Sequence, residues 1–180
     1  MVELQPPIYI LGVRISEPVT ALTDFLVSAV CLYALRKLGG QSNSDRKYFR
    51  LYFLLLGLAV FWGGLVTHAF GYLVSQPWKA PGWIVSTWAV SLFAFAVIKY
   101  HSRGIGNLAQ WLHGLIIAEL FLIMAVTLYT IEFKWAGLHS AFGLVLIVAP
   151  LSGWSYFKFR DSFSLFLLIG VGIFFLSGLT

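Results

Sequence analysis

Two carboxylates, Glu17 and Asp24, lie seven residues apart in the first apolar segment, ISEPVTALTDFLVSAVCLYAL, residues 15–35. Seven residues make about two helical turns, so both side chains project from one helix face. An Asp at the centre of a membrane helix costs about 2.5–3.5 kcal/mol on insertion scales, so this face is expected to look into a bundle or wet cavity. Steps of three and four residues extend it into a polar stripe of Glu17, Thr20, Asp24, Ser28 and Cys31.

Two roles are open for this stripe. It could be a hydrogen-bond network between helices, or a site for a cation or a polar headgroup. Ser16 is expected to cap the helix and Pro18 to occupy its first turn. Glu17 then lies at the positive end of the helix dipole, which stabilises a carboxylate by a few tenths to about 1 kcal/mol. A purely structural role for Glu17 therefore also stays open.

His68, in FWGGLVTHAFGYL, is expected to face Asp24 at a similar depth in the bundle. It shares a helix face with Gly64 and Gly71, with Thr67 beside it, and small residues allow close helix approach. The depths predict a hydrogen bond from Asp24 to His68. Imidazole is also a common metal ligand that carboxylates orient, so His68 is either a zinc ligand or a hydrogen-bonded core residue.

Four other ionisable residues receive separate predictions. His139 opens the fifth segment as a second metal ligand or an interfacial residue, and the interfacial role is preferred. Glu119 is near mid-membrane, where an acid is functional or structurally hydrogen-bonded. His113 lies six residues before Glu119 and faces another side of the helix, so the two are not a local pair. His101, in KYHSRG, is expected at the surface.

The elements that position these residues are predicted to be membrane helices. The 180 residues have a mean hydropathy of +0.86, with 59% hydrophobic and 11% charged residues, far from the composition of soluble domains. We therefore predict an all-α polytopic membrane bundle, a single domain over residues 1–180, in contact with membrane lipids. Cys31 is the only cysteine, which excludes an intrachain disulfide. The six predicted spans are residues 16–36, 49–75, 82–100, 106–131, 135–157 and 162–180.

Basic residues predict the orientation of these spans. Segments around the loops at 37–48, 101–106 and 158–161 hold nine of the twelve Lys and Arg residues, and the opposite ends hold three. These loops are expected in the cytoplasm and the N-terminus outside. The basic residues lie in short loops between apolar runs, so no nucleic-acid partner is expected. The last span is apolar to Thr180, which leads us to expect a further segment beyond it.

The first two spans resemble the alkaline ceramidase and adiponectin-receptor-like superfamily of seven-helix membrane hydrolases. EPVTALTD is similar to the acidic opening of the superfamily's first helix, and GGLVTH is similar to the turn before its zinc-binding histidine. The resemblance covers about the first 75 residues. It implies that His68 binds zinc, that Asp24 is a ligand or orients one, and that Glu17 matches a calcium-binding acid. It also implies a lipid amide hydrolase with a seventh helix.

The chain departs from this pattern in three ways. Gly64 replaces the superfamily's Ser, no Asp occurs between Asp45 and Asp161, and the remaining zinc-binding histidines would follow Thr180. We therefore expect no complete zinc site on these 180 residues, and catalytic competence is an open question. The alternatives are a non-catalytic accessory subunit bound to other membrane-protein subunits, and a di-haem b-type cytochrome using the four histidines. The loop position expected for His101 and the absence of the usual alternate-helix pairing disfavour haem.

Overall fold

A computed structural model describes residues 5–39 and 44–177, which form an all-α bundle with one small hairpin. The hairpin pairs β1 (Ile8–Ile10) with β2 (Val13–Ile15) in antiparallel register. Leu11 and Gly12 form its two-residue turn with φ values of 49° and 80°. Positive φ at both positions is what a type I′ hairpin turn requires. The sequence patterns used above did not predict this hairpin.

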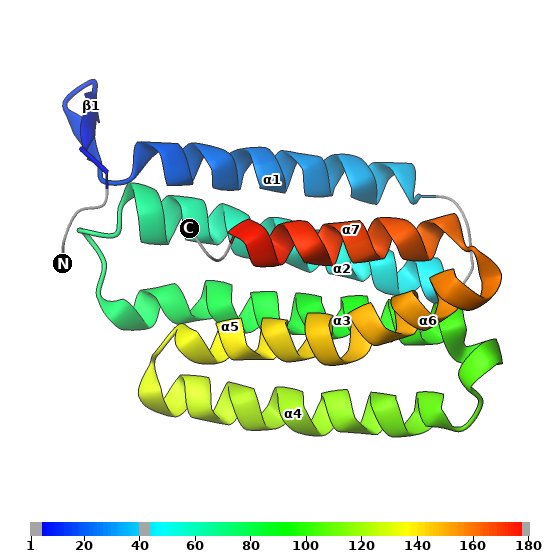
Figure 1. The fold of residues 1–180 in the computed structure, drawn as a ribbon. Coiled ribbons are helices and arrows are strands. Elements are labelled where there is room, and N and C mark those ends of the chain that lie inside the picture. The colour runs from blue at the N-terminus through cyan, green and yellow to red at the C-terminus, as the bar shows by residue number, and fades with distance from the viewer. Residues whose placement is uncertain (1–4, 40–43, 178–180) are drawn as a thin grey trace.

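Six helical rods follow the hairpin (Figure 1). The first is α1 and the second joins α2 to the π-helical η1. A 3-10 turn, η2, leads into α3, and α4 is the fourth rod. The fifth joins α5, the π-helical η3 and α6, and α7 is the sixth. Their bounds are α1 Pro18–Lys37, α2 Ser44–Trp62, η1 Gly63–Ala69, η2 Gln76–Lys79, α3 Ala80–Ile105, α4 Leu108–Thr130, α5 Lys134–Ala141, η3 Phe142–Val148, α6 Ala149–Phe159 and α7 Ser162–Ser177.

The rods lie roughly antiparallel, with α1 on one side of the bundle, α4 on the other, and α3 between them (Figure 1). The most buried rod is α3, and its Ala94, Val97 and Ile98 pack against Ile116 of α4 and Val148 of η3. The hairpin and the turns that lead into α3 and α5 lie at the same end of the bundle. That end holds the candidate site.

Five rods are long and apolar enough to cross a membrane, a judgement of length and composition: residues 18–37, 46–69, 76–102, 108–130 and 134–159. The last predicted span appears as α7, a 16-residue apolar helix over the described residues, and residues 178–180 lie outside them. The predicted second span ends earlier, at Ala69, because the chain turns at Gly71, where a side chain would strike the Thr67 carbonyl. The third ends later, at Ile105, which keeps His101 inside the helix.

The predicted Ser16 cap is wrong. Glu17 occupies the N-cap position of α1 with no side-chain capping bond, and the buried Ser16 hydroxyl has no hydrogen-bond partner. The physical reason is that Ser16 is one residue too early, and its backbone N–H is bonded to Ala69 of η1. Pro18 does occupy the first turn, where its missing N–H costs nothing.

Candidate functional site

Two backbone hydrogen bonds hold the residues just before α1 against η1. Ser16 N–H donates to the Ala69 carbonyl at 3.1 Å, and Glu17 N–H donates to the His68 carbonyl at 3.0 Å. These bonds satisfy two backbone donors next to the open N-terminal turn of α1. They also bring the side chains of Glu17 and His68 to the same place, although 51 residues separate them in sequence.

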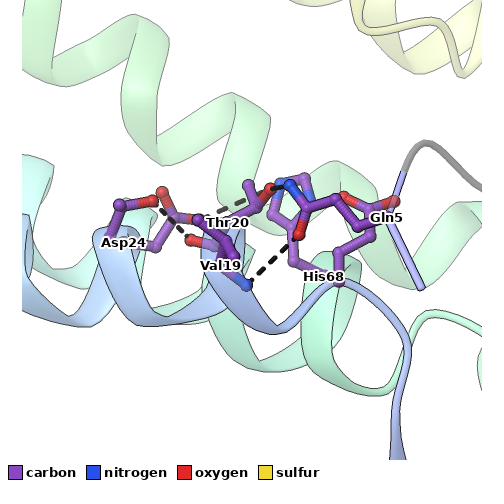
Figure 2. Close-up of polar contacts among 7 residues, drawn as sticks. Gln5, Val19, Thr20, Asp24 and His68 are labelled. Atoms are coloured by element: carbon purple, nitrogen blue, oxygen red, sulfur yellow. Dashed lines mark hydrogen bonds and ion pairs between the residues drawn. The ribbon is translucent and has the colours of Figure 1, made fainter. Parts of the chain in front are cut away.

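His68 lies between two carboxylates of α1. Its Nδ1 is 2.7 Å from Glu17 Oε2, and its Nε2 is 3.9 Å from Asp24 Oδ2. Figure 2 shows His68 directed toward α1, on the side of the helix that carries Asp24. Asp24 therefore points to another helix, as predicted. The predicted hydrogen bond from Asp24 to His68 is wrong, because 3.9 Å is too long and Glu17, tethered by its backbone, reaches the imidazole instead.

Glycine at position 64 permits this close approach of the helices. A Cβ atom there would lie 2.9 Å from Asp24 Cβ and 3.3 Å from the Ala21 carbonyl oxygen. The neighbouring Gly63 faces the Asp24 carboxylate, with its Cβ position 3.5 Å from Oδ2. The π-helical turn of η1 begins at these glycines and carries His68, and π-helical turns are frequent at functional sites.

The hydrogen bond to Glu17 determines how His68 presents its other nitrogen. A carboxylate accepts, so Nδ1 carries the proton that it donates to Glu17. In the neutral imidazole, Nε2 is then an unprotonated acceptor on the Asp24 side. The separation from Asp24 leaves room for a bridging water or for a ligand group that contacts both side chains.

A cavity of about 520 Å³ opens beside Asp24 and His68, between α1, η1, α2, α3, α5, η3 and α7. Its remaining wall is mostly apolar and aromatic, and includes Leu56, Trp83, Phe93, Phe133, Leu144 and Phe174. The Trp83 and Phe133 rings are 5.7 Å apart. The cavity thus combines Asp24, His68 and a few hydroxyl groups with a wall that is mostly apolar.

The rest of the polar stripe on α1 makes structural contacts. The buried Ser28 hydroxyl donates to the Gly57 carbonyl of α2 at 3.0 Å, and buried Cys31 packs against the same glycine. The side-chain amide of Gln5 makes two bonds to α1: its Nε2 donates to the Thr20 hydroxyl at 2.8 Å, and its Oε1 accepts from Val19 N–H (Figure 2). Thr67 is half-buried on η1. The stripe is therefore partly a helix network and partly a cavity wall.

His139 and Glu119 form a second buried pair. His139 Nδ1 is 2.5 Å from Glu119 Oε2, and its Nε2 lies 2.9 Å from the Thr87 carbonyl and 3.1 Å from the Ser91 hydroxyl. The preferred interfacial placement of His139 is wrong, since its side chain is 1% exposed. The helix buries it because three polar partners on α3 and α4 satisfy the ring.

The two remaining histidines lie apart from both pairs. His113 Nδ1 is 2.6 Å from the Ala109 carbonyl of its own helix, and its ring stacks on Phe95. Its separation from Glu119 agrees with the prediction. His101 is 5% exposed, so the predicted surface position is wrong; the ring packs edge-on against Tyr100 inside the extended α3.

The described residues do not fit either metal that the resemblance implies. Among them, no group of three or more His, Cys, Asp or Glu side chains is placed to hold a metal ion. Catalytic zinc takes three protein ligands and a water, whereas His68 has Asp24 on its open side. Calcium needs six to eight oxygens, and the Glu17 carboxylate is already bonded to His68. His139 is committed to Glu119, Thr87 and Ser91.

Sequence reasoning missed the pairing of Glu119 with His139 and the role of Gln5. Glu17, Glu119, His68 and His139 were visible as ionisable residues in apolar segments, but His68 was matched to Asp24 and His139 was given no acidic partner. Gln5 lies in the segment before the hairpin, where no periodicity indicates a contact with α1. Gly64, on the same helix face as His68, was the sequence signal for the close helix packing that the structure shows.

Fold and site together define an all-α bundle of long apolar helices with a histidine–carboxylate site at the mouth of an apolar cavity. The chain belongs to a family of unknown function, DUF6962, whose family model matches residues 19–180. No curated protein and no solved structure matches the chain. The cavity beside Asp24 and His68 is therefore the observation that bears on function.

Proposed function

We propose that this protein is a multi-pass integral membrane protein that binds an amphiphilic molecule in the cavity beside Asp24 and His68. The observation that carries the proposal is the composition of that cavity. Asp24 and His68 line it together with the hydroxyl-bearing Tyr52, Ser86 and Ser140, and the other lining side chains are aromatic, aliphatic or absent, as in glycine. Its volume of about 520 Å³ lies within the range of roughly 300–1,000 Å³ that is usual for small-molecule sites.

The bound headgroup is one that donates hydrogen bonds. Asp24 and, in the neutral ring, His68 Nε2 both offer acceptors on the cavity side, and Glu17 adds a second negative charge behind the imidazole. An amide, hydroxyl or amine head satisfies these acceptors, whereas a phosphate would meet like charge. The aromatic rings of Trp83 and Phe133 favour a cationic amine further.

The proposed orientation places the hairpin and this site toward the outside. The opposite ends of the rods carry the basic residues, and the positive-inside rule assigns those ends to the cytoplasm. Nine Lys and Arg residues lie at those opposite ends: Arg36, Lys37, Arg46, Lys47, Arg50, Lys99, Arg103, Lys158 and Arg160. Three lie at the site end: Arg14, Lys79 and Lys134.

A ceramidase-like hydrolysis of a lipid amide is a second proposal, favoured by the same pairing of a histidine with acids of the first helix. Among the described residues, no group of three or more His, Cys, Asp or Glu side chains forms the zinc site that this hydrolysis uses. Binding of the amphiphile does not depend on that step. The accessory-subunit and di-haem alternatives stay predictions.

The proposal is tested with three amphiphiles of equal chain length and different heads: lauramide, dodecylamine and dodecyl phosphate. Binding to the purified protein in lipid nanodiscs is measured by calorimetry for the wild type, Asp24→Asn and His68→Gln. We expect the amide or the amine to bind, and each substitution to weaken binding about tenfold, the size of one hydrogen bond to a charged group.

The matched control is His113→Gln, because His113 bonds to its own helix, away from the cavity. It should bind like the wild type. Equal binding of dodecyl phosphate, or unchanged affinity in both site variants, would overturn the proposal.

A further inference from the structure

The pair Glu119–His139 is not needed to bind an amphiphile, yet it brings polar groups of three helices together. Glu119 comes from α4, His139 from α5, and Thr87 and Ser91 from α3. Thr87, Ser91 and His139 are each 1% exposed. Polar groups at this depth are costly unless each has a partner, and here both imidazole nitrogens have one.

The hydrogen-bond partners of His139 determine which of its ring nitrogens carries a proton. The Thr87 carbonyl can only accept, so the 2.9 Å contact requires a hydrogen on His139 Nε2. One further proton then lies between Nδ1 and Glu119 Oε2, which are 2.5 Å apart. It belongs either to the ring, as imidazolium beside carboxylate, or to the acid, as neutral imidazole beside a carboxyl group. The pair is electrically neutral in both forms.

The polar groups around this pair on α3, α4 and α5 are uncharged or bonded to partners of their own. On α3, the groups that face it are the uncharged Thr87 and Ser91. At the turn from α4 to α5, Glu132 and Lys134 pair with each other at 2.5 Å. The other titratable group on α4, His113, bonds to Ala109. Gain or loss of a proton therefore changes the net charge of the pair without compensation nearby.

The two side chains of the pair differ in solvent exposure. The His139 side chain is 1% exposed, whereas that of Glu119 is 14% exposed. The surrounding surface of α4 is apolar, with Leu115 48% and Leu122 63% exposed. The carboxyl group is thus the end through which a proton can enter or leave, and a small apolar reagent can reach it.

We propose that Glu119 and His139 form a proton-binding site within the bundle, which exchanges one proton through the Glu119 carboxyl group. The site is separate from the cavity wall formed by Asp24 and His68, and its test uses no amphiphile. In the proton-loaded state the pair is neutral. In the released state Glu119 is ionised beside a neutral imidazole that still donates from Nε2 to Thr87.

The primary test is a titration of the His139 ring nitrogens by 15N NMR in the intact protein in nanodiscs. We expect the Nδ1 signal to move in one step within the pH range in which the protein stays folded, because loss of the shared proton changes the bonding of Nδ1. In Glu119→Gln the amide still bonds to Nδ1 but cannot ionise, so the step should shift or disappear. A ring signal that stays fixed throughout this range in the wild type would overturn the proposal.

The second measurement follows the acid itself with dicyclohexylcarbodiimide, an apolar reagent for protonated carboxyl groups. Labelling of Glu119, located by mass spectrometry, should fall as pH rises through the step seen by NMR. In His139→Gln it should lose this pH dependence, because the Glu119 carboxyl group no longer shares a proton with an imidazole. Exposed Glu132 is the internal control and should stay unlabelled. Labelling of Glu119 that is independent of pH in the wild type would contradict proton exchange.

Discussion

At the scale of single residues, His68 and His139 show how one kind of pair serves two environments. Each ring bonds to a glutamate through Nδ1. The Nε2 atom of His139 is held by a backbone carbonyl, whereas that of His68 faces Asp24 and the cavity at a distance too long for a direct hydrogen bond. Of these two histidines, only His68 has a ring nitrogen available to a ligand, and the proposed headgroup contact uses it.

Asp161 supplies a residue-scale prediction outside the apolar spans. It caps α7, accepting from Phe163 N–H at 3.1 Å and from the Ser164 hydroxyl at 2.6 Å. Desolvation acts to raise the pKa of Asp161, but the hydrogen bonds from Ser164, Phe163 and Tyr100 outweigh it and hold the pKa below its ordinary value. We expect Asp161→Ala to lower the stability by about 0.5–2 kcal/mol at neutral pH.

The pH dependence of that loss has a definite sign. Since the folded pKa lies below the unfolded one, the contribution is full above the unfolded pKa, about 4, and disappears as pH falls through the folded pKa. Thermal unfolding in detergent, from neutral pH down toward pH 3, should show wild type and Asp161→Ala converging. Glu132→Ala, which breaks an exposed ion pair, should change little. A constant gap between wild type and Asp161→Ala would refute the cap.

The sequence did not predict which glutamate each of these histidines contacts. Counting from the turn at 131–133, Glu119 lies about 16 Å along α4 and His139 about 8 Å along α5, at 1.5 Å per residue. Depth alone therefore does not pair them. The contact depends on the longitudinal offset of α5 against α4, which packing determines. The polar stripe on α1 was predictable because it needs only helical periodicity.

At the scale of elements, the joint between α1 and η1 depends on the absence of a side chain at position 64. Gly64→Ala would place a Cβ atom 2.9 Å from Asp24 Cβ, and the Ala21 carbonyl oxygen at 3.3 Å and the Phe25 ring at 3.4 Å limit relaxation. We expect a loss of about 1–3 kcal/mol from this overpacking, measured as a lower unfolding temperature in detergent. The separation of α1 from η1 should also weaken binding in the cavity.

Gly114→Ala is the matched control for that substitution. It also lies in a long apolar helix, but nothing is within 4 Å of its Cβ position. Alanine there should leave the stability unchanged or raise it by up to about 1 kcal/mol through helix propensity. Equal unfolding temperatures for Gly64→Ala and the wild type would show that the two helices are not in close contact.

Element boundaries were predictable where composition changes and not where backbone geometry changes. The Gly- and charge-containing breaks separated the predicted spans correctly, whereas the π-helical turns at 63–69 and 142–148 carry no periodic signal. In η3 the cause is nearby: Pro150 lacks an N–H, and its ring crowds the preceding turn, so the helix widens before it. Around η1, the glycines at 63 and 64 and the bonds that Ser16 and Glu17 N–H donate to the Ala69 and His68 carbonyls accompany the widening.

At the scale of the whole molecule, the apolar composition predicted the bundle because any long apolar run must satisfy its backbone internally. The hairpin escaped prediction since it is only three residues on each strand. The hairpin lies next to η1 because Ser16 and Glu17, the two residues that follow β2, bond through their backbone N–H groups to the Ala69 and His68 carbonyls.

The orientation of the bundle is the last prediction. In a Cys31→Ala background, which removes the one native thiol, single cysteines are placed at Ser75 and Ser42. Ser75 is exposed at the site end, and residue 42 lies outside the described residues, in the loop between α1 and α2. Because basic residues gather at the opposite end from the site, we expect an impermeant maleimide to label Ser75→Cys in intact cells, and Ser42→Cys only after permeabilisation. The reverse pattern would invert the bundle and place the cavity in the half nearer the cytoplasm, and labelling of both positions from outside would show that the rod between them, formed by α2 and η1, does not cross the membrane.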